Sequence, residues 1–294
     1  MSIAIIINPV AGGARREDAR ARAELAAATV EQQGETPDIV VTERAGHARL
    51  LARAAVTRGA RLVMAWGGDG TINEVAGALA FGDIPIGIIA AGSGNGLATD
   101  LAIDRRPAGA IIDAMRAMPR LMDLGEVGGR LFANVAGIGF DAHVASRFND
   151  PDNRRRGFLT YVRIAARCLL TYVPVDYTIV IGDSTTAVRA VLIAIANSAQ
   201  YGNGAQIAPG ARVDDGELDV VVVQERSRLR TICQTPRLFN GSIVRAPGCS
   251  MFRITSGHIQ STDPIIYHVD GEPCRGGTDL QIRVHPAALK ICVR

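Results

Sequence analysis

A glycine-rich stretch around one aspartate, Gly67-Gly-Asp-Gly-Thr71, is the strongest chemical signal in the sequence. A predicted strand ends at Trp66 and a helix is expected from Thr71, where Thr71 and Glu74 have the spacing of a capping box. Glycines let backbone N–H groups approach a ligand, and a helix N-terminus favours phosphate. Asp69 would repel phosphate unless a cation intervened, which points to a Mg²⁺-bound nucleotide.

Two more turns of small residues follow predicted strands in the same way. Asn8-Pro-Val-Ala-Gly-Gly13 follows the first strand, and Ala91-Gly-Ser-Gly-Asn-Gly96 follows the fourth and precedes a helix expected at Leu97. Ligands of open α/β sheets bind where the carboxyl ends of the strands meet. Three such turns at one edge favour a phosphate-bearing ligand. The alternative is a structural α/β domain with tight connections.

Two common nucleotide-binding motifs are excluded. A P-loop requires a lysine after its second glycine, but the only lysine in the chain is Lys290, near the C-terminus. A Rossmann motif requires Gly-x-Gly-x-x-Gly in the first strand-to-helix turn. The first turn lacks this spacing, and Gly92-Ser-Gly-Asn-Gly96 carries its third glycine one position early.

The elements that must position these turns alternate regularly up to about Arg120. Short apolar runs typical of buried parallel strands alternate with helix-forming segments. Strands are expected over Ile3–Ile7, Ile39–Thr42, Leu62–Trp66 and Ile86–Ala90, and helices over Arg15–Gln33, His47–Arg58 and Thr71–Ala80. This alternation predicts a parallel sheet with helices on both faces.

After about Leu121 the pattern changes to β-rich runs separated by Gly, Asp, Asn and Pro, which is typical of an antiparallel sandwich or barrel. Strands are expected over Tyr177–Ile181, Ala187–Ala196, Leu218–Val223, Phe252–Ser256, Ile265–Val269 and Leu280–Val284, and helices over Phe158–Tyr172 and Ser227–Phe239. Arg120–Gly129 is the best candidate linker. We therefore predict an α/β domain over residues 1–124 and a β-sandwich domain over residues 125–284.

Composition limits the class of protein. The 294 residues are 48% hydrophobic and 21% charged, which is typical of soluble globular proteins and excludes disorder. A net charge of +3 and 4% aromatic residues argue against a nucleic-acid partner. The five cysteines are widely spaced and indicate reduced thiols in a cytosolic protein. The sequence has no apolar run long enough to cross a membrane and no recognisable signal peptide, so we expect a cytoplasmic protein whose membrane contact is peripheral, at the inner face.

The three turns, in this order, resemble the catalytic domain of the diacylglycerol kinase family of lipid kinases, which includes sphingosine and ceramide kinases. Further matches, spread over nearly the whole chain, are Asp123-Leu-Gly125, Phe132-x-Asn134, Gly137-x-Gly-Phe-Asp141, Asp214-Asp-Gly-Glu-Leu-Asp219 and Asp270-Gly-Glu272. The central motif alone is shared with NAD kinases and, more loosely, phosphofructokinases. The resemblance implies an ATP- and Mg²⁺-dependent lipid kinase whose first domain is NAD kinase-like, with residues 285–294 returning to that domain.

The resemblance also implies roles for individual residues. ATP is expected against Asn8, Pro9, Val10, Ala11, Gly12, Thr42, Gly67, Gly68, Asp69, Gly70, Thr71, Ile72, Asn73 and Ser93. The structural Mg²⁺ site of the family matches Arg212, Asp215 and Glu217, with backbone carbonyls from Arg212 and Glu217 because a guanidinium cannot ligate a cation. Asp123 matches an acidic residue that supports the metal–water network around Asp69.

Glu272 is the catalytic base that the resemblance implies, and Asp69 and Asp270 complete the expected catalytic residues. An alcohol nucleophile benefits from a carboxylate that accepts its proton. In this interpretation Asp270 fixes the turn or holds Glu272 in place. The residues alone favour a simpler alternative, in which Asp270-Gly271 is a hairpin turn and Glu272 is solvated.

Diacylglycerol is the expected lipid, with one departure from the pattern. Many bacterial members carry an acidic residue after the asparagine of the third loop, whereas here Gly96 follows Asn95, as in sphingosine and ceramide kinases. A sphingosine- or ceramide-type kinase is therefore the main alternative. An NAD or sugar kinase and a non-catalytic nucleotide-binding protein are the others. A homodimer is compatible with the sequence.

The segment Phe158–Tyr172 bears on membrane contact. It carries apolar residues broadly around a helix, with Arg163 and Arg167 four residues apart, and Arg154–Arg156 precedes it. An apolar face with arginines suits a helix that lies on anionic lipid. We favour the alternative for the helix itself, a core helix with two snorkelling arginines, and expect membrane contact from the triple arginine.

Overall fold

The structure is a computed structural model that describes residues 2–13, 18–150 and 157–294. It divides into two compact units: unit 1 comprises Met1–Met122 and Ala287–Arg294, and unit 2 comprises Asp123–Pro286. The sequence-based prediction divides the chain at 124/125 and 284/285. The triple arginine Arg154–Arg156 and the expected start of the first helix, at Arg15, lie outside the described residues.

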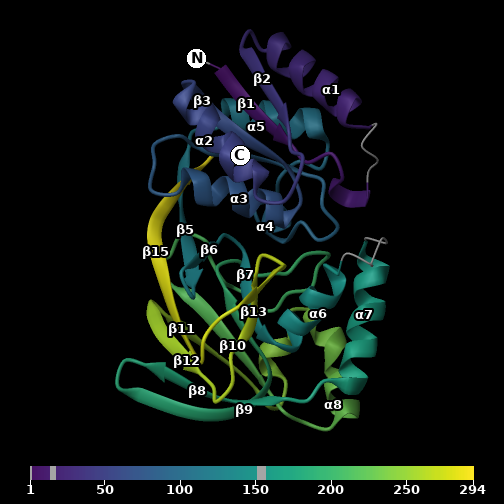
Figure 1. Cartoon of the computed structure of the whole chain (residues 1–294), viewed down its shortest axis with the longest axis vertical. Coiled ribbons are helices and arrows are strands. Elements are labelled where there is room, and N and C mark those ends of the chain that lie inside the picture. Colours follow the sequence, from purple (N-terminus) through teal and green to yellow (C-terminus); the bar gives the residue numbers. More distant parts are fainter. Residues whose placement is uncertain (1, 14–17, 151–156) are drawn as a thin grey trace. The chain divides into compact units, whose positions relative to one another are not determined.

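Unit 1 is built on a parallel sheet in the order β4-β3-β1-β2, of which Figure 1 labels β3, β1 and β2. Its strands are β1 Ser2–Ile7, β2 Thr36–Val41, β3 Ala60–Gly67 and β4 Ile86–Ala90, and its helices are α1 Asp18–Gln32, α2 His47–Thr57, α3 Asp69–Leu79, α4 Gly96–Asp100 and α5 Pro107–Arg116. A 3₁₀ turn spans Ala11–Gly13. The carboxyl ends of the four strands point to one edge, as a parallel sheet requires.

Helices cover both faces of this sheet. Ile3, Ile5 and Ile7 of β1 share one buried cluster with side chains of α1 and α5. The alternate residues, Ala4 and Ile6, are buried on the opposite face, where α2 contacts β1 and α3. The predicted parallel sheet covered on both faces is confirmed.

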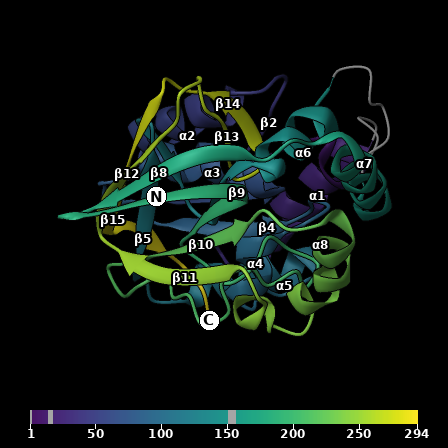
Figure 2. The same cartoon turned by 90° about the horizontal axis from the view of Figure 1, so that it is seen from below.

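Unit 2 is an antiparallel, β-sandwich-like domain, as predicted. Its strands are β5 Arg120–Val127, β6 Arg130–Phe132, β7 Val135–Gly139, β8 Val175–Ile181, β9 Ser184–Ala196, β10 Leu218–Gln224, β11 Cys249–Ile254, β12 Ser256–Gln260, β13 Ile266–Val269, β14 Glu272–Arg275 and β15 Asp279–Ile291. Its helices are α6 Phe140–Phe148, α7 Phe158–Thr171 and α8 Arg228–Gln234, with 3₁₀ turns at Thr235–Leu238 and Ile243–Arg245. Figure 2 shows β8, β9, β10 and β11 side by side, each antiparallel to its neighbour. In the described ranges, each helix is too short or too polar to cross a bilayer.

The C-terminal end of β15 belongs to unit 1. Ile291 pairs with Ile86 of β4 in a parallel register, and the N–H of Cys292 donates to the carbonyl of Ile86 at 2.8 Å. Lys290 Nζ lies 2.7 Å from Asp83 Oδ1. The last residues of the chain therefore extend the parallel sheet beside β4.

Three local predictions differ from the structure. The expected linker, Arg120–Gly129, contains the boundary between the units, which falls after Met122, but its residues 120–127 form strand β5, which pairs with β6 and β15. The expected strand Phe252–Ser256 is two strands, β11 and β12, which separate at Thr255. The expected long helix from Ser227 ends at Gln234 and continues as a 3₁₀ turn, since Pro236 has no N–H to donate.

The predicted capping box at Thr71 is also wrong. Helix α3 begins two residues earlier, at Asp69, and its N-cap, Gly68, has no side chain to accept a bond. The carboxylate of Glu74 instead accepts the N–H groups of Gly46 at 2.7 Å and Ala48 at 2.9 Å. Glu74 therefore caps the N-terminus of the neighbouring helix α2 and ties the two helices together.

Replacing Glu74 by alanine should destabilise unit 1. The substitution leaves two N–H groups at the start of α2 without their acceptor, and lost caps cost about 0.5–2 kcal/mol. We expect the Tm to fall by about 4 °C in a thermal melt. Glu31→Ala, at an exposed position of α1, should shift the Tm by less than about 1 °C. Equal shifts for both variants would show that the cap contributes nothing.

Candidate active site

Three glycine-rich loops follow strands of unit 1: the first is Asn8–Gly13, the second Gly67–Thr71 and the third Ala91–Gly96. The first and second loops meet through one asparagine. Asn8 follows β1, and its Nδ2 donates to Thr71 Oγ1 in α3 at 3.0 Å. The backbone N–H of Asn8 donates to the carbonyl of Trp66 at 2.9 Å, and its Oδ1 accepts the N–H of Val10 at 3.1 Å. Asn8 therefore fixes its own loop to the Gly67–Thr71 loop at the carboxyl edge of the sheet.

The loops approach so closely that a side chain would not fit between them. A Cβ atom on Gly92 would lie 2.5 Å from Gly68 Cα, and one on Gly12 would lie 2.3 Å from the carbonyl oxygen of Ala91. Gly12 also has a φ of +71°, which disfavours other residues. The three loops predicted to share one edge of the sheet are thus packed backbone against backbone within unit 1.

Asp69 lies at this junction with one carboxylate oxygen unpaired. Its Oδ2 accepts the N–H of Asn95, the N-cap residue of α4, at 3.0 Å. Its Oδ1 is buried and has no hydrogen-bond partner among the described residues. Burial raises the pKa of the Asp69 carboxyl, although the backbone N–H groups of Asn95, Asp69, Gly96 and Leu97 oppose this. An unpaired buried oxygen of this kind is the donor that Mg²⁺ or a metal-bound water requires, so the site fits the expected cation.

The remaining residues expected to contact ATP lie at the same edge of the sheet, but some of their side chains are buried and cannot contact a ligand. The N–H of Thr42, which follows β2, donates to the carbonyl of Ile7 at 2.9 Å, and Ser93 is half-buried in the third loop. Val10 is exposed, whereas Ile72 is 1% exposed and faces the core. Ile72 can therefore offer a ligand only its backbone.

Arg22 is a residue of this edge that sequence reasoning missed. From α1, its Nη1 donates to the carbonyl of Asn8 at 3.1 Å and its Nη2 to that of Ala11 at 3.3 Å. Its guanidinium carbon lies 5.9 Å from the ring centroid of Trp66. Arg22 therefore holds the first loop in place. No local motif marks it, because α1 carries many arginines.

In unit 2, the expected catalytic segment is a hairpin turn. Val269 of β13 pairs with Glu272 of β14, and the two residues between them, Asp270 and Gly271, have φ values of 48° and 82°. These positive values are typical of a two-residue hairpin turn. Glu272 opens β14 and is exposed. The backbone thus forms the hairpin turn that the alternative interpretation expects, and Glu272 is exposed to solvent.

Asp270 holds this hairpin to the strand beside it. Its buried carboxylate accepts three consecutive N–H groups, those of Ala133 at 2.8 Å, Asn134 at 2.9 Å and Val135 at 3.0 Å. The backbone N–H of Asp270 donates in turn to the carbonyl of Val135 at 3.0 Å. With its oxygens engaged in this way, Asp270 is suited to positioning the turn and not to accepting a substrate proton.

A buried Asp–His pair, which sequence reasoning missed, lies behind the same turn. His268 Nε2 is 2.8 Å from Asp141 Oδ2, and both side chains are buried. His268 Nδ1 also accepts the N–H of Gly271 at 3.2 Å, so the ring contacts both Asp141 and the turn. Burial raises the pKa of Asp141, yet the nearby imidazole of His268, with two tyrosine hydroxyls, outweighs this and holds the pKa below its ordinary value. Asn149 Nδ2 also donates to the carbonyl of Gly271 at 2.8 Å.

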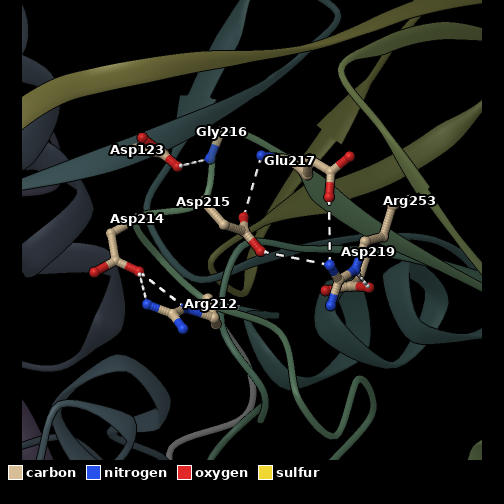
Figure 3. Close-up of polar contacts among 8 residues, drawn as sticks. All are labelled: Asp123, Arg212, Asp214, Asp215, Gly216, Glu217, Asp219 and Arg253. Atoms are coloured by element: carbon tan, nitrogen blue, oxygen red, sulfur yellow. Dashed lines mark hydrogen bonds and ion pairs between the residues drawn. The ribbon is translucent and has the colours of Figure 1, made fainter.

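The expected metal-site loop is shown in Figure 3. Asp123 Oδ2 accepts the N–H of Gly216 at 2.7 Å, and Asp215 Oδ1 accepts the N–H of Glu217 at 3.2 Å. The side chain of Arg212 is exposed and pairs with Asp214 at 3.3 Å, so any contribution of Arg212 to a cation must come from its carbonyl. Asp123 therefore fixes the shape of this loop.

Arg253 provides a positive charge beside the same loop. Its Nη1 is 3.4 Å from Glu217 Oε2 and 3.9 Å from Asp215 Oδ2, and its Nε is 3.4 Å from Asp219 Oδ1 (Figure 3). Burial raises the pKa of Asp219, and Arg253 opposes this. In the described ranges, no three His, Cys, Asp or Glu side chains are grouped to hold a metal. The oxygen donors suit Mg²⁺, but the side chains already share one cation, Arg253.

Comparisons with known proteins agree with this fold. The family profile described as "Diacylglycerol kinase catalytic domain" matches residues 2–127, and the one described as "YegS C-terminal NAD kinase beta sandwich-like domain" matches residues 134–293. A protein of Chromohalobacter salexigens named "Probable lipid kinase YegS-like" is 30% identical over 249 residues, which are 83% of this chain and 80% of that protein. One named "Diacylglycerol kinase" from Mycobacterium tuberculosis is 29% identical over 98% of this chain and 94% of its own.

Solved structures share the fold at lower identity. A crystal structure of a diacylglycerol kinase from Bacillus anthracis has a TM-score of 0.72 at 19% identity and covers 100% of this chain and 97% of its own. A second crystal structure from that organism gives 0.82 at 20% identity and covers 100% and 95%. The chain therefore belongs to the diacylglycerol kinase catalytic-domain family, and it is a phosphotransferase of the lipid kinase class. The predicted family, fold class and enzyme class are confirmed.

Asp69→Asn should stabilise the protein at neutral pH when nucleotide and magnesium are absent. Because the folded-state pKa of Asp69 is raised, its ionisation costs stability as pH rises through that pKa, whereas asparagine stays neutral. We expect the Tm of the variant to exceed that of the parent by about 2 °C at neutral pH, with the gain shrinking as the pH is lowered. Asp263→Asn, at an exposed position, is the control. A lower Tm for Asp69→Asn at neutral pH would contradict this charge balance.

Arg253→Met should make unit 2 more responsive to magnesium. Without the guanidinium, the carboxylates of Asp215, Glu217 and Asp219 repel one another, and a bound cation that relieves this stabilises the fold by mass action. We expect saturating Mg²⁺ to raise the Tm of the variant by about 3 °C or more, and the parent less. Adding Asp215→Ala should remove the gain.

Arg189→Met is the matched control for this experiment, because Arg189 lies between Asp176 and Glu225, away from the loop. Its response to Mg²⁺ should equal that of the parent. Equal magnesium responses in Arg253→Met and Arg189→Met would show that the metal site is wrongly placed.

Proposed function

We propose that this lipid kinase transfers the γ-phosphoryl group of Mg²⁺-bound ATP to a hydroxyl of a membrane lipid, with diacylglycerol as the expected acceptor. The observation that carries the proposal is the junction of three glycine-rich loops around the unpaired oxygen of Asp69. The relative from M. tuberculosis named "Diacylglycerol kinase", matched along almost its whole length, supports the choice of acceptor.

In this proposal the loops of unit 1 bind and orient the nucleotide. Backbone N–H groups of Gly67–Thr71 and the N-terminus of α3 receive the phosphates. Asn8 and Arg22 keep the first loop in register with the second. Magnesium, when bound, neutralises phosphate charge, and Asp69 offers the oxygen that holds it or its water. Arg212 and Glu217 carbonyls with the Asp215 carboxylate would hold the second, structural Mg²⁺.

Glu272 is the group we propose as the proton acceptor. Phosphoryl transfer depends mostly on positioning and charge neutralisation, but an alcohol oxygen must lose its proton as it bonds to phosphorus. The proton passes to the Glu272 carboxylate, the phosphoryl group bonds to the lipid oxygen, and ADP departs. Asp270, His268 and Asn149 hold the adjoining turn, so they position Glu272 without touching the lipid.

We propose that the reaction takes place at the membrane surface, because the acceptor is confined to the bilayer, and at its inner face, because the widely spaced cysteines indicate reduced thiols in a cytosolic protein. The glycine after Asn95, which favours a sphingosine- or ceramide-type kinase by resemblance, does not weigh against diacylglycerol. The third loop packs on Gly68 and bonds to Asp69, so it belongs to the nucleotide side of the site. An assay with diacylglycerol, sphingosine, ceramide and NAD as acceptors decides among these alternatives.

Glu272→Gln and Asp69→Asn should both lower turnover, for different reasons. Glu272→Gln keeps the size of the side chain and removes its basicity, so we expect turnover to fall about a hundredfold or more while ATP affinity changes by less than about twofold.

Asp69→Asn should also lower turnover about a hundredfold, and the dependence of the rate on magnesium should weaken. Labelled ATP, calorimetric ATP binding and the Glu31→Gln control measure these effects.

Two results would overturn these assignments. Loss of ATP binding in Glu272→Gln, with normal turnover per bound ATP, would make Glu272 a nucleotide ligand. Near-normal turnover in a folded Asp69→Asn variant would remove the Gly67–Thr71 loop from the reaction.

A further inference from the structure

Helix α7 concentrates exposed apolar side chains on one stripe. Leu159 is 83% exposed, Val162 44% and Leu170 62%, and Val173, just after the helix, is 64% exposed. Residues 159, 162, 166 and 170 are spaced by three or four positions and therefore lie on one face of a helix. We refer to Leu159, Val162, Ala166 and Leu170 as the α7 outer face.

The opposite face fixes the orientation of the helix. Tyr161 donates to Asp141 Oδ1 at 3.3 Å, and its ring packs edge-on against Phe148 of α6 at 5.7 Å between centroids. Cys168 is buried. Figures 1 and 2 both show α7 on the outside of α6, at the margin of unit 2. The favoured interpretation of a core helix is therefore wrong for the outer face, which is exposed.

The charges along α7 are all of one sign. Arg163 and Arg167 are exposed and border the outer face, one turn apart. No aspartate or glutamate occurs between residues 157 and 175. We propose that the α7 outer face, with Arg163 and Arg167, binds the surface of a bilayer that contains anionic lipids. The choice of a bilayer rests on the proposed lipid substrate.

Charge complementarity favours a bilayer over a second copy of the chain. In a two-fold symmetric dimer through this face, the arginines of one copy would meet those of the other with no carboxylate between them. On an anionic bilayer, the leucines enter the acyl boundary while both guanidinium groups reach lipid phosphates. The helix would then lie parallel to the membrane, with unit 2 anchored through α6.

Sedimentation with vesicles tests the proposal. The parent should bind phosphatidylcholine vesicles that contain a quarter phosphatidylglycerol more tightly than pure phosphatidylcholine vesicles. Leu159→Ser with Leu170→Ser should weaken binding to both by about tenfold or more, and Arg163→Gln with Arg167→Gln should weaken only the anionic preference, by about tenfold. Matched controls on unit 1 are Leu25→Ser with Leu50→Ser and Arg49→Gln with Arg53→Gln, all at exposed helical positions.

Several outcomes overturn the proposal. Vesicle binding that does not depend on α7 would contradict it, and so would an equal loss of binding in the control pairs. An effect of the arginines without the leucines would mean that the face does not enter the bilayer. A parent dimer that the leucine substitutions dissociate would make the face an interface between copies.

The same variants separate this proposal from the proposed function. On diacylglycerol dispersed in detergent, the α7 variants should turn over within about twofold of the parent, because the candidate site is intact. If no lipid is phosphorylated in any form while vesicle binding still follows α7, the proposed function fails and the surface stands. If lipid is phosphorylated normally but vesicle binding does not depend on α7, the proposed function stands and the proposed membrane-binding surface fails.

Discussion

The loops of the candidate site depend on one interaction, a buried or half-buried carboxylate that accepts backbone N–H groups from another segment of the chain. Asp69 accepts from Asn95 and joins the second loop to the third. Asp123 accepts from Gly216, and Asp270 from three successive residues beginning at Ala133. Loops lack the repeated hydrogen bonds of helices and strands, so a carboxyl side chain that accepts backbone N–H groups holds the loop in their place.

This way of holding loops separates positioning from chemistry. The oxygens of Asp270 are used on backbone donors, whereas the carboxylate of Glu272, two residues later, is exposed. In unit 1 the division falls within one side chain, since Asp69 uses Oδ2 on the backbone while Oδ1 is unpaired among the residues that the structure describes. A carboxylate that is half engaged is fixed in direction yet able to receive a cation, which is the preorganisation that phosphoryl transfer requires.

Much of the fold could be predicted because strands and glycine-rich turns are local signals. The apolar run Ile86–Ala90 predicts β4 with its observed bounds, and the three turns predict the edge where their loops meet. Contacts between distant segments could not be predicted in the same way. Glu74 caps α2 and not its own helix, and His268 lies against Asp141. Both pairs join residues that are far apart in the sequence, so they arise only from tertiary packing. The exposure of the α7 outer face could not be predicted, since apolar residues at helical spacing indicate a buried face as readily as a membrane-binding one.

Two basic side chains of unit 1 are engaged by the protein itself. The only lysine, Lys290, is 2.7 Å from Asp83, and Arg22 is directed at loop carbonyls. In the proposed reaction, backbone N–H groups and a divalent cation would neutralise the phosphate charge. Burial raises the pKa of Asp69, and its Oδ1 has no hydrogen-bond partner within the part of the chain that the structure describes. A cation placed there would favour the ionised carboxylate, so ionisation of Asp69 and binding of the metal–nucleotide complex support each other.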